Sequence, residues 1–159
     1  MIALGLICYL AGLRINTTKS IPVGIYRLTD VPVGKGEYVI FYSPADRAVR
    51  RGAQRGYIGA GSCPGYGYTI KCVLGVEGDV VSSGDEGIGV NGKLLLASAP
   101  KEADSAGRVL PRYPFSDYTL KESELLLMSD VSGTSFDGHY FGPMNLSQIE
   151  GVVTPIILL

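Results

Sequence analysis

The apolar residues of this sequence fall in short runs that glycine and proline interrupt. The 159 residues include 22 glycines and 9 prolines, and the runs between them are rich in β-branched and aromatic residues. Such runs are short for helices and match strands of about four to eight residues joined by turns. The sequence therefore predicts a mainly β fold of short strands, barrel-like or coiled, with little helix.

The expected strands include one hairpin with a recognisable turn. Within residues 88–96, Asn91-Gly92 is the two-residue signal of a type I′ turn, because both residues tolerate a positive φ. Residues 97–124 are polar and contain prolines, which indicates an excursion over the surface, and residues 44–55 could hold a short helix. The segments expected as strands are 24–28, 37–42, 68–76, 80–81, 88–96, 125–128 and 148–157.

The N-terminal segment, MIALGLICYLAGL, is almost wholly apolar and ends at Arg14. It is shorter than the roughly 20 residues that span a bilayer, and it lacks the basic start of a secretory signal. We interpret residues 1–14 as the end of an N-terminal membrane anchor and residues 15–159 as a single domain. An ordinary buried helix or strand is the alternative for the first segment. The apolar tail at 151–159 predicts a final strand or a membrane-facing edge.

Charge and metal-ligand counts narrow the classes of function. The chain has 14 basic and 15 acidic residues, so it lacks the basic excess that nucleic-acid binding requires. One histidine, His139, and three scattered cysteines do not form a metal-binding pattern, and we expect no metal and no cofactor. Cys63 and Cys72 are the pair that could form a disulfide; bonded and free thiols both remain open.

Three familiar motifs of catalysis or cofactor binding occur in part, but the residues around them do not fit the structures that these motifs require. A Ser-His-Asp triad would need His139, which lies two residues from Asp137 on the same loop, a poor spacing for orienting the ring. Residues 98–101 match SxxK, but Pro100 disrupts the helical turn that this motif requires. Residues 87–92 match GxGxxG but precede a strand, not the helix of a dinucleotide site.

The remaining chemistry is a serine activated by a lysine. A lysine serves as a base only when it is neutral, and burial favours that form because it penalises the charge. Of six lysines, only Lys71 lies within an apolar strand. A lysine in such a strand is more often an edge residue whose amine reaches solvent. Ser20 precedes Pro22 in an extended, turning segment, which an ordinary linker would also explain.

Three segments of the chain carry a family resemblance. They are NTTKSIPVGIY at 16–26, YTIKCVLGVEGD at 68–79 and SDVSGTSFDGHYFG at 129–142. In this order they resemble the nucleophile, lysine and third segments of the signal peptidase I family, most closely its conjugative-transfer branch. This ordered match favours Ser20 and Lys71 over the linker and the edge lysine. Cys72 stands where the family has an arginine, and Gly138-His139 stands where it has Ser-Arg, so no salt bridge is implied there.

The resemblance implies coiled antiparallel β-sheets that form a Ser-Lys peptidase domain over residues 15–159. Ser20 would attack the scissile carbonyl while Lys71 takes its proton. The Ser20 backbone N–H and the Thr18 hydroxyl would form the oxyanion hole. Ser135 would orient the lysine amine, and Asp137 would fix the third segment, with a more direct catalytic part in the conjugative branch.

The same resemblance implies a substrate and a location. The conjugative branch processes a pilin precursor through an acyl-enzyme and joins the ends of the pilin into a circle. The implied enzyme sits in the inner membrane with its catalytic domain in the periplasm, where other type IV secretion components are possible partners. Three alternatives remain: a general signal peptidase that hydrolyses signal peptides, a self-cleaving repressor-type peptidase, and a non-enzymatic β-rich envelope component of a secretion channel.

Overall fold

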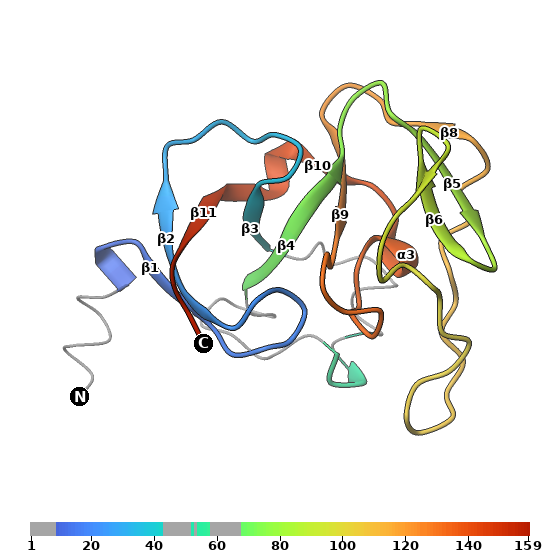
Figure 1. Ribbon diagram of the computed structural model, residues 1–159, viewed down its shortest axis with the longest axis horizontal. Coiled ribbons are helices and arrows are strands. Elements are labelled where there is room, and N and C mark those ends of the chain that lie inside the picture. Colours follow the sequence, from blue (N-terminus) through green and yellow to red (C-terminus); the bar gives the residue numbers. More distant parts are fainter. Residues whose placement is uncertain (1–8, 43–51, 53, 58–67) are drawn as a thin grey trace.

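The computed structural model describes residues 9–42, 52, 54–57 and 68–159, and these residues form two antiparallel sheets (Figure 1). The larger sheet has seven strands in the order β1-β2-β11-β3-β4-β9-β10, and the smaller has four in the order β7-β6-β5-β8. The strands are β1 Leu13–Asn16, β2 Gly24–Thr29, β3 Tyr38–Tyr42, β4 Tyr68–Gly75, β5 Val80–Gly84, β6 Gly87–Val90, β7 Lys93–Leu94, β8 Tyr118–Thr119, β9 Glu124–Met128, β10 Met144–Asn145 and β11 Ile149–Leu158. Two short helices, α3 Gly138–Phe141 and the 3₁₀ helix η1 Leu146–Gln148, follow β9.

The predicted mainly β fold is confirmed, and every segment expected as a strand contains one. Asn91 and Gly92 have φ values of 52° and 75°, so the β6–β7 turn has the positive φ angles that the sequence predicted. The sequence did not predict β1, β8, β10 or α3. All four elements are only two to four residues long, too short for a periodic pattern. Most of the possible helix at 44–55 lies outside the described residues.

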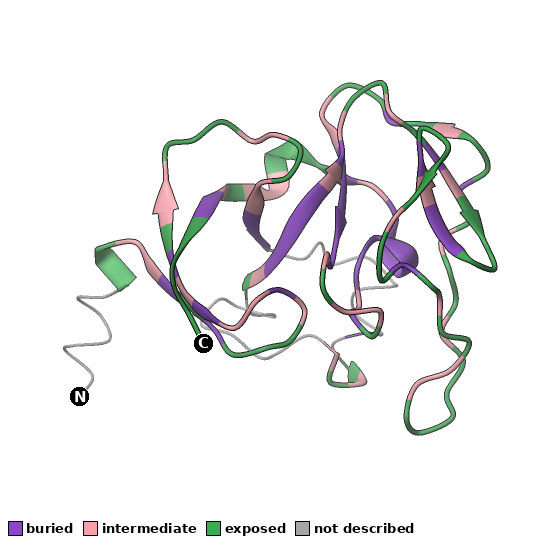
Figure 2. Ribbon diagram, viewed as in Figure 1, coloured by how far each residue is buried: buried purple, intermediate pink, exposed green. Residues whose placement is uncertain are grey.

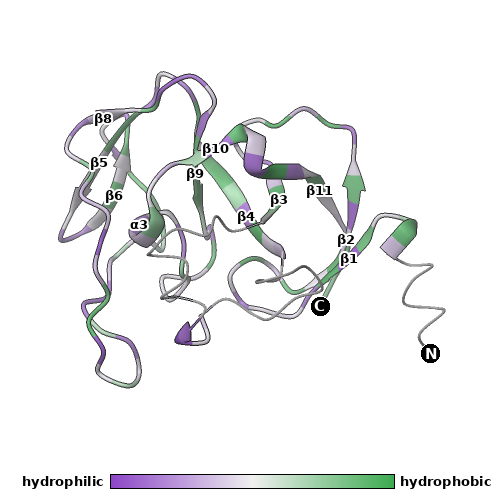
Figure 3. Cartoon of the chain, turned by 180° about the vertical axis from the view of Figure 1, so that it is seen from behind, coloured by the Kyte–Doolittle hydropathy of each residue, from purple (hydrophilic) through white to green (hydrophobic). Residues whose placement is uncertain are grey.

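The two faces of the larger sheet pack into separate clusters. Along β3, Val39 and Phe41 join one cluster and Ile40 joins another, as the alternation of side chains in a strand requires. Along β9, Leu126 and Met128 reach a third cluster, which the smaller sheet completes. Figure 2 shows β3, β4 and β9 buried, and Figure 3 shows hydrophobic residues along β4 and β9. The centre of the larger sheet is therefore covered on both faces.

Strand β4 occupies this covered centre, between β3 and β9. Lys71 pairs with Val39 of β3, and the next residue, Cys72, pairs with Met128 of β9. Backbone hydrogen bonds to β3 and β9 hold the strand. They fix the position of the Lys71 Cα independently of its side-chain contacts.

The first strand of the sheet begins inside the segment that we assigned to the anchor. Leu13 and Arg14 lie in β1, where Arg14 is paired with Tyr26 of β2. The Arg14 side chain is buried, and its guanidinium lies 3.1 Å from Glu150 of β11 and 4.1 Å from the centre of the Tyr9 ring. Among the residues that the structure describes, no helix is long and apolar enough to cross a bilayer.

The C-terminal segment forms the long strand β11, which confirms the predicted final strand. It lies between β2 and β3, although it comes last in the sequence. Its last residues, including Ile156, Ile157 and Leu158, leave about half of their side-chain surface exposed. Strand β11 thus joins the β1–β2 hairpin, which leads to Ser20, to the β3–β4 pair, which carries Lys71.

Candidate active site

The turn between β1 and β2 carries Ser20, and a single buried side chain organises it. Asn16 ends β1, and its Nδ2 donates to the carbonyl oxygens of Thr18, Ile21 and Pro22 at 2.8, 3.2 and 3.1 Å. Its Oδ1 accepts the backbone N–H and the hydroxyl of Thr18 at 3.2 and 2.8 Å. Asn16 therefore satisfies backbone groups on both sides of Ser20 and fixes the shape of the turn.

The hydroxyl of Ser20 lies 2.9 Å from the hydroxyl of Thr18. An amide oxygen only accepts, so the Thr18 hydroxyl donates its hydrogen bond to the Asn16 Oδ1. Thr18 has no second hydroxyl hydrogen, and the Ser20 hydroxyl must therefore be the donor between the two. In this state the proton of Ser20 points toward Thr18.

The amine of Lys71 is buried beside Ser135. Lys71 is 3% exposed, and its Nζ donates to the Ser135 Oγ at 2.6 Å. Burial lowers the pKa of Lys71 to about 8, although the negative charge of Asp137 opposes this shift. A fraction of the lysine is therefore neutral near pH 7 and could accept a proton.

Asp137 lies in the third segment and shapes it through hydrogen bonds. It is the N-cap of α3, and its Oδ1 accepts the backbone N–H of His139 at 3.2 Å. Its Oδ2 accepts the backbone N–H of Ser129 at 3.0 Å, which closes the loop that contains Ser135. Asp137 is thus placed to support the loop, and it acts on Lys71 through its charge and not through a hydrogen bond.

Ser20 and Lys71 open onto one cleft. The cleft has a volume of about 890 Å³, and Thr18 and Ser135 also line it. Within the described parts of the chain, no hydrogen bond joins Ser20 to Lys71, and each side chain bonds to a neighbouring hydroxyl instead. The structure thus brings four of the five predicted site residues to one cleft, and Asp137 lies behind it.

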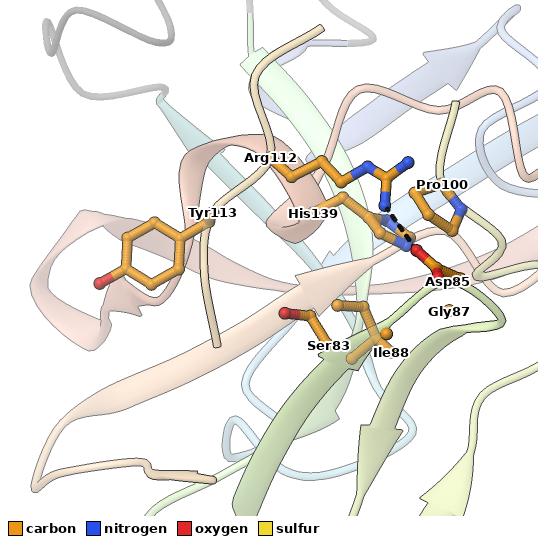
Figure 4. A pocket seen from close by; sticks show the side chains of 9 residues that line it. Ser83, Asp85, Gly87, Ile88, Pro100, Arg112, Tyr113 and His139 are labelled. Carbon is orange, nitrogen blue, oxygen red and sulfur yellow. Dashed lines mark ion pairs between the residues drawn. The ribbon is translucent and has the colours of Figure 1, made fainter. Parts of the chain in front are cut away.

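A second, smaller pocket of about 150 Å³ lies beside His139 (Figure 4). His139 and Ile88 form part of its wall, and Arg112 pairs with Asp85 at 3.8 Å across it. Neither Ser20 nor Lys71 lines this pocket. Ser20 and Lys71, the predicted nucleophile and base, both line the larger cleft.

The described residues, with gaps at 1–8, 43–51, 53 and 58–67, hold no group of three or more His, Cys, Asp or Glu side chains that could ligate a metal. Cys63, the possible disulfide partner of Cys72, lies outside the described residues. Cys72 is buried on β4 next to Lys71.

The residue that sequence reasoning missed is Asn16. Its signal was weak but present, because an asparagine followed two residues later by threonine at a strand end is typical of a side chain that bonds to its own turn. The segment 16–26 was matched for its serine and proline, and the asparagine carried no assigned role.

The comparisons with known proteins identify the family of the chain. Residues 6–158 match the model of the family described as signal peptidase, peptidase S26. The chain belongs to this family of signal peptidases. Among its relatives is the plasmid transfer protein TraF of Escherichia coli, 57% identical over 150 residues that cover 94% of this chain and 84% of that protein.

Two further similarities are more distant. The probable conjugal transfer protein TraF of Sinorhizobium fredii is 36% identical over 162 residues, covering 99% of this chain and 84% of that protein. A signal peptidase I of Enterococcus faecalis, whose crystal structure is known, matches with a TM-score of 0.45 and 19% identity, over 79% of this chain and 100% of that one.

We predict that Asn16→Ala loosens the turn between β1 and β2 that carries Ser20. The substitution leaves buried backbone groups without partners, which costs about 1–3 kcal/mol of unfolding free energy. Misplacement of Ser20 then lowers the rate of peptide cleavage by roughly 10- to 100-fold. Denaturant unfolding and steady-state cleavage of a substrate that carries a signal peptide measure the two effects.

Asn145→Ala is the matched control, since Asn145 caps η1 outside the cleft and its Oδ1 accepts the N–H of Ser147 at 2.9 Å. It should lower stability and leave cleavage by the folded protein unchanged. Wild-type cleavage by Asn16→Ala would show that the turn does not depend on this side chain.

Proposed function

We propose that this chain is a membrane-associated serine endopeptidase that processes a pilin precursor during conjugation. The observation that carries the proposal is the buried Lys71 amine, held by Ser135 in the cleft that Ser20 also lines. Membership of the signal peptidase family supports a peptidase. The names of the similar TraF proteins, which refer to plasmid and conjugal transfer, support the role in conjugation.

In the proposed reaction, the Ser20 Oγ attacks the scissile carbonyl carbon and gives its proton to the neutral Lys71 Nζ. The tetrahedral intermediate collapses, and the leaving amine takes that proton from Lys71. The product is an ester between Ser20 and the pilin, and the lysine is neutral again. Ser20 must first release its hydrogen bond to Thr18 and turn that proton toward the Lys71 Nζ.

The proposed oxyanion hole consists of the Ser20 backbone N–H and the Thr18 hydroxyl. Such a donor is worth about 2.7–4 kcal/mol of activation free energy. In the resting state the Thr18 hydrogen is held by Asn16. Thr18 therefore takes this role only after its hydroxyl rotates toward the substrate and its hydrogen leaves the Asn16 Oδ1.

The acyl-enzyme is then resolved by an amine or by water. In the proposed cyclisation, the N-terminal amine of the pilin attacks the ester carbonyl, a peptide bond forms, and Ser20 recovers its proton through Lys71. A cleft of about 890 Å³ has room for a second chain end beside the ester. We place the enzyme at the inner membrane, with the catalytic domain in the periplasm and other secretion components as possible partners.

Mass spectrometry of the pilin tests the acceptor. We expect the product formed with this protein to weigh one water less than the linear processed pilin, because ring closure forms a peptide bond without hydrolysis. The pilin expressed alone is the control. A product with the linear mass would identify a general signal peptidase and exclude cyclisation.

Removal of either member of the pair should abolish processing. Ser20→Ala lacks the nucleophile and Lys71→Met lacks the base, and each should reduce cleavage of the precursor at least about 1000-fold while the fold is retained. Lys93→Met is the control, since Lys93 is exposed on the smaller sheet. If Ser20→Ala still matured the pilin in cells, the non-enzymatic alternative would be favoured.

The pH dependence of kcat/KM should follow the lysine. Because burial lowers the pKa of Lys71 to about 8, kcat/KM should rise with pH and level off above that value. The unfolded lysine keeps its proton up to a pKa of 10.5, so the unfolded state binds more protons between about pH 8 and 10.5. The free energy of unfolding should therefore gain about 3 kcal/mol across this window, at about 1.4 kcal/mol per unit.

Cleavage assays at several pH values measure kcat/KM, and denaturant titrations at the same pH values measure the free energy of unfolding. Lys71→Met should lose this contribution to the pH dependence of stability. A wild-type kcat/KM that rose only near pH 10.5 would contradict a base of lowered pKa.

A further inference from the structure

His139 is a buried ionisable group that the proposed reaction does not use. It is the one histidine of the chain and is 5% exposed. Both nitrogens of its ring have partners: Nδ1 lies 2.9 Å from the Asp137 Oδ1, and Nε2 lies 2.5 Å from the carbonyl oxygen of Ser98. The ring therefore connects the third segment to the excursion at 97–124.

The two partners determine where the protons are. A carbonyl oxygen only accepts, so Nε2 must carry a hydrogen. The Asp137 carboxylate accepts backbone N–H groups from Ser129 and His139, so both of its oxygens already act as acceptors. An ionised carboxylate also only accepts, so Nδ1 must carry a hydrogen as well. A ring with both hydrogens is an imidazolium.

The other charges around the ring do not reverse this result. Across the small pocket, Arg112 faces His139 from the excursion and Asp85 faces it from the turn after β5, and these two pair with each other (Figure 4). Burial lowers the pKa of His139, and Arg112 adds a weaker effect of the same sign. The hydrogen bond and charge of Asp137, together with the hydrogen bond to Ser98, outweigh them and raise the pKa above its ordinary value. The ring of Tyr140 packs 5.8 Å away and carries no charge near neutral pH.

The charge of Asp137 also acts on Lys71. Its negative charge raises the pKa of Lys71, against the effect of burial. A positive charge on His139, at 2.9 Å from the Asp137 Oδ1, offsets that carboxylate. Asp137 therefore presents Lys71 with a full negative charge only when His139 is neutral.

We propose that His139 is held as an imidazolium that neutralises Asp137 from behind and so favours the neutral, base-competent form of Lys71. This inference rests on the proposed function of Lys71 as the base. His139 does not touch the substrate and is a positioning residue. When it loses its proton, Lys71 binds its own proton more tightly, so activity depends on two coupled ionisations.

Nuclear magnetic resonance tests the charge of the ring without any activity measurement. Because the chain has one histidine, ring ¹³C and ¹⁵N shifts of labelled protein need no assignment. We expect imidazolium shifts at pH 7 and a midpoint above the ordinary value of about 6.5. Asp137→Asn should lower that midpoint, whereas Asp85→Asn, at a fully exposed carboxylate, should leave it nearly unchanged. A wild-type ring that is neutral at pH 7 overturns the proposal, even if Asp137→Asn fails to fold.

The pH profile of cleavage tests the link to Lys71. His139→Arg keeps a positive charge at every pH, and the pocket of about 150 Å³ beside the ring offers room for the longer side chain. His139→Gln keeps hydrogen bonding without charge. The midpoint of kcat/KM should lie about one pH unit lower for the arginine than for the glutamine variant, which is about tenfold in rate below the midpoint. Equal midpoints in two folded variants would leave His139 a merely structural role.

The two proposals fail in different ways. Cleavage retained by Lys71→Met would remove the base itself, whatever the charge of His139. A neutral His139 ring with an inactive Lys71→Met would remove only the coupling. If neither variant of His139 folds, the ring shifts of the wild-type protein alone decide.

Discussion

The burial of one lysine amine is the constraint on which the rest of the site depends. An amine that loses its water favours the neutral form, and the lowered pKa of Lys71, about 8, corresponds to roughly 3 kcal/mol of lost stability at neutral pH. The central position of β4 tolerates this cost, since strands on both sides and packed clusters on both faces hold the residue. Among the residues that the structure describes, Ser135 supplies the single hydrogen bond to the amine. A lysine on an edge strand would stay hydrated and charged, and the proposed chemistry would have no base.

Ser20, the proposed nucleophile, is positioned in a different way. Ser20 stands on a turn, where backbone groups need partners. Asn16 forms four hydrogen bonds to such groups and a fifth to the Thr18 hydroxyl. The resulting chain of donors runs from Ser20 through Thr18 to Asn16 and leads away from Lys71. In the resting state, nucleophile and base are each satisfied by a neighbouring hydroxyl. In the proposed reaction, both side chains exchange these bonds when the substrate binds.

The structure explains what Gly138 and His139, the two departures from the family pattern in the third segment, contact. The glycine at 138 allows close packing, because a Cβ there would lie 3.0 Å from the carbonyl oxygen of Leu127 and 2.9 Å from the Leu126 side chain. The histidine at 139 brings a ring whose charge follows pH to a place where the family has a permanently charged arginine. The sequence implied no salt bridge there, and the structure pairs His139 with Asp137 at 2.9 Å. The hydrogen bonds of Asp137 to backbone N–H groups support the loop that contains Ser135, while its catalytic part stays a prediction.

The sequence by itself determined the mainly β architecture, the Asn91-Gly92 turn, the location of Lys71 in an apolar strand and the ordered segments around Ser20, Lys71 and Ser135. These properties are local, since alternation, turn chemistry and spacing can be read within a dozen residues. Only the tertiary structure decided that β11 joins the two halves of the sheet, that β1 begins at Leu13, and that Asn16 and His139 form the hydrogen bonds behind the nucleophile and the base. Pairing between distant strands depends on how the whole core packs, and a polar side chain finds its partners only after that packing has fixed their positions.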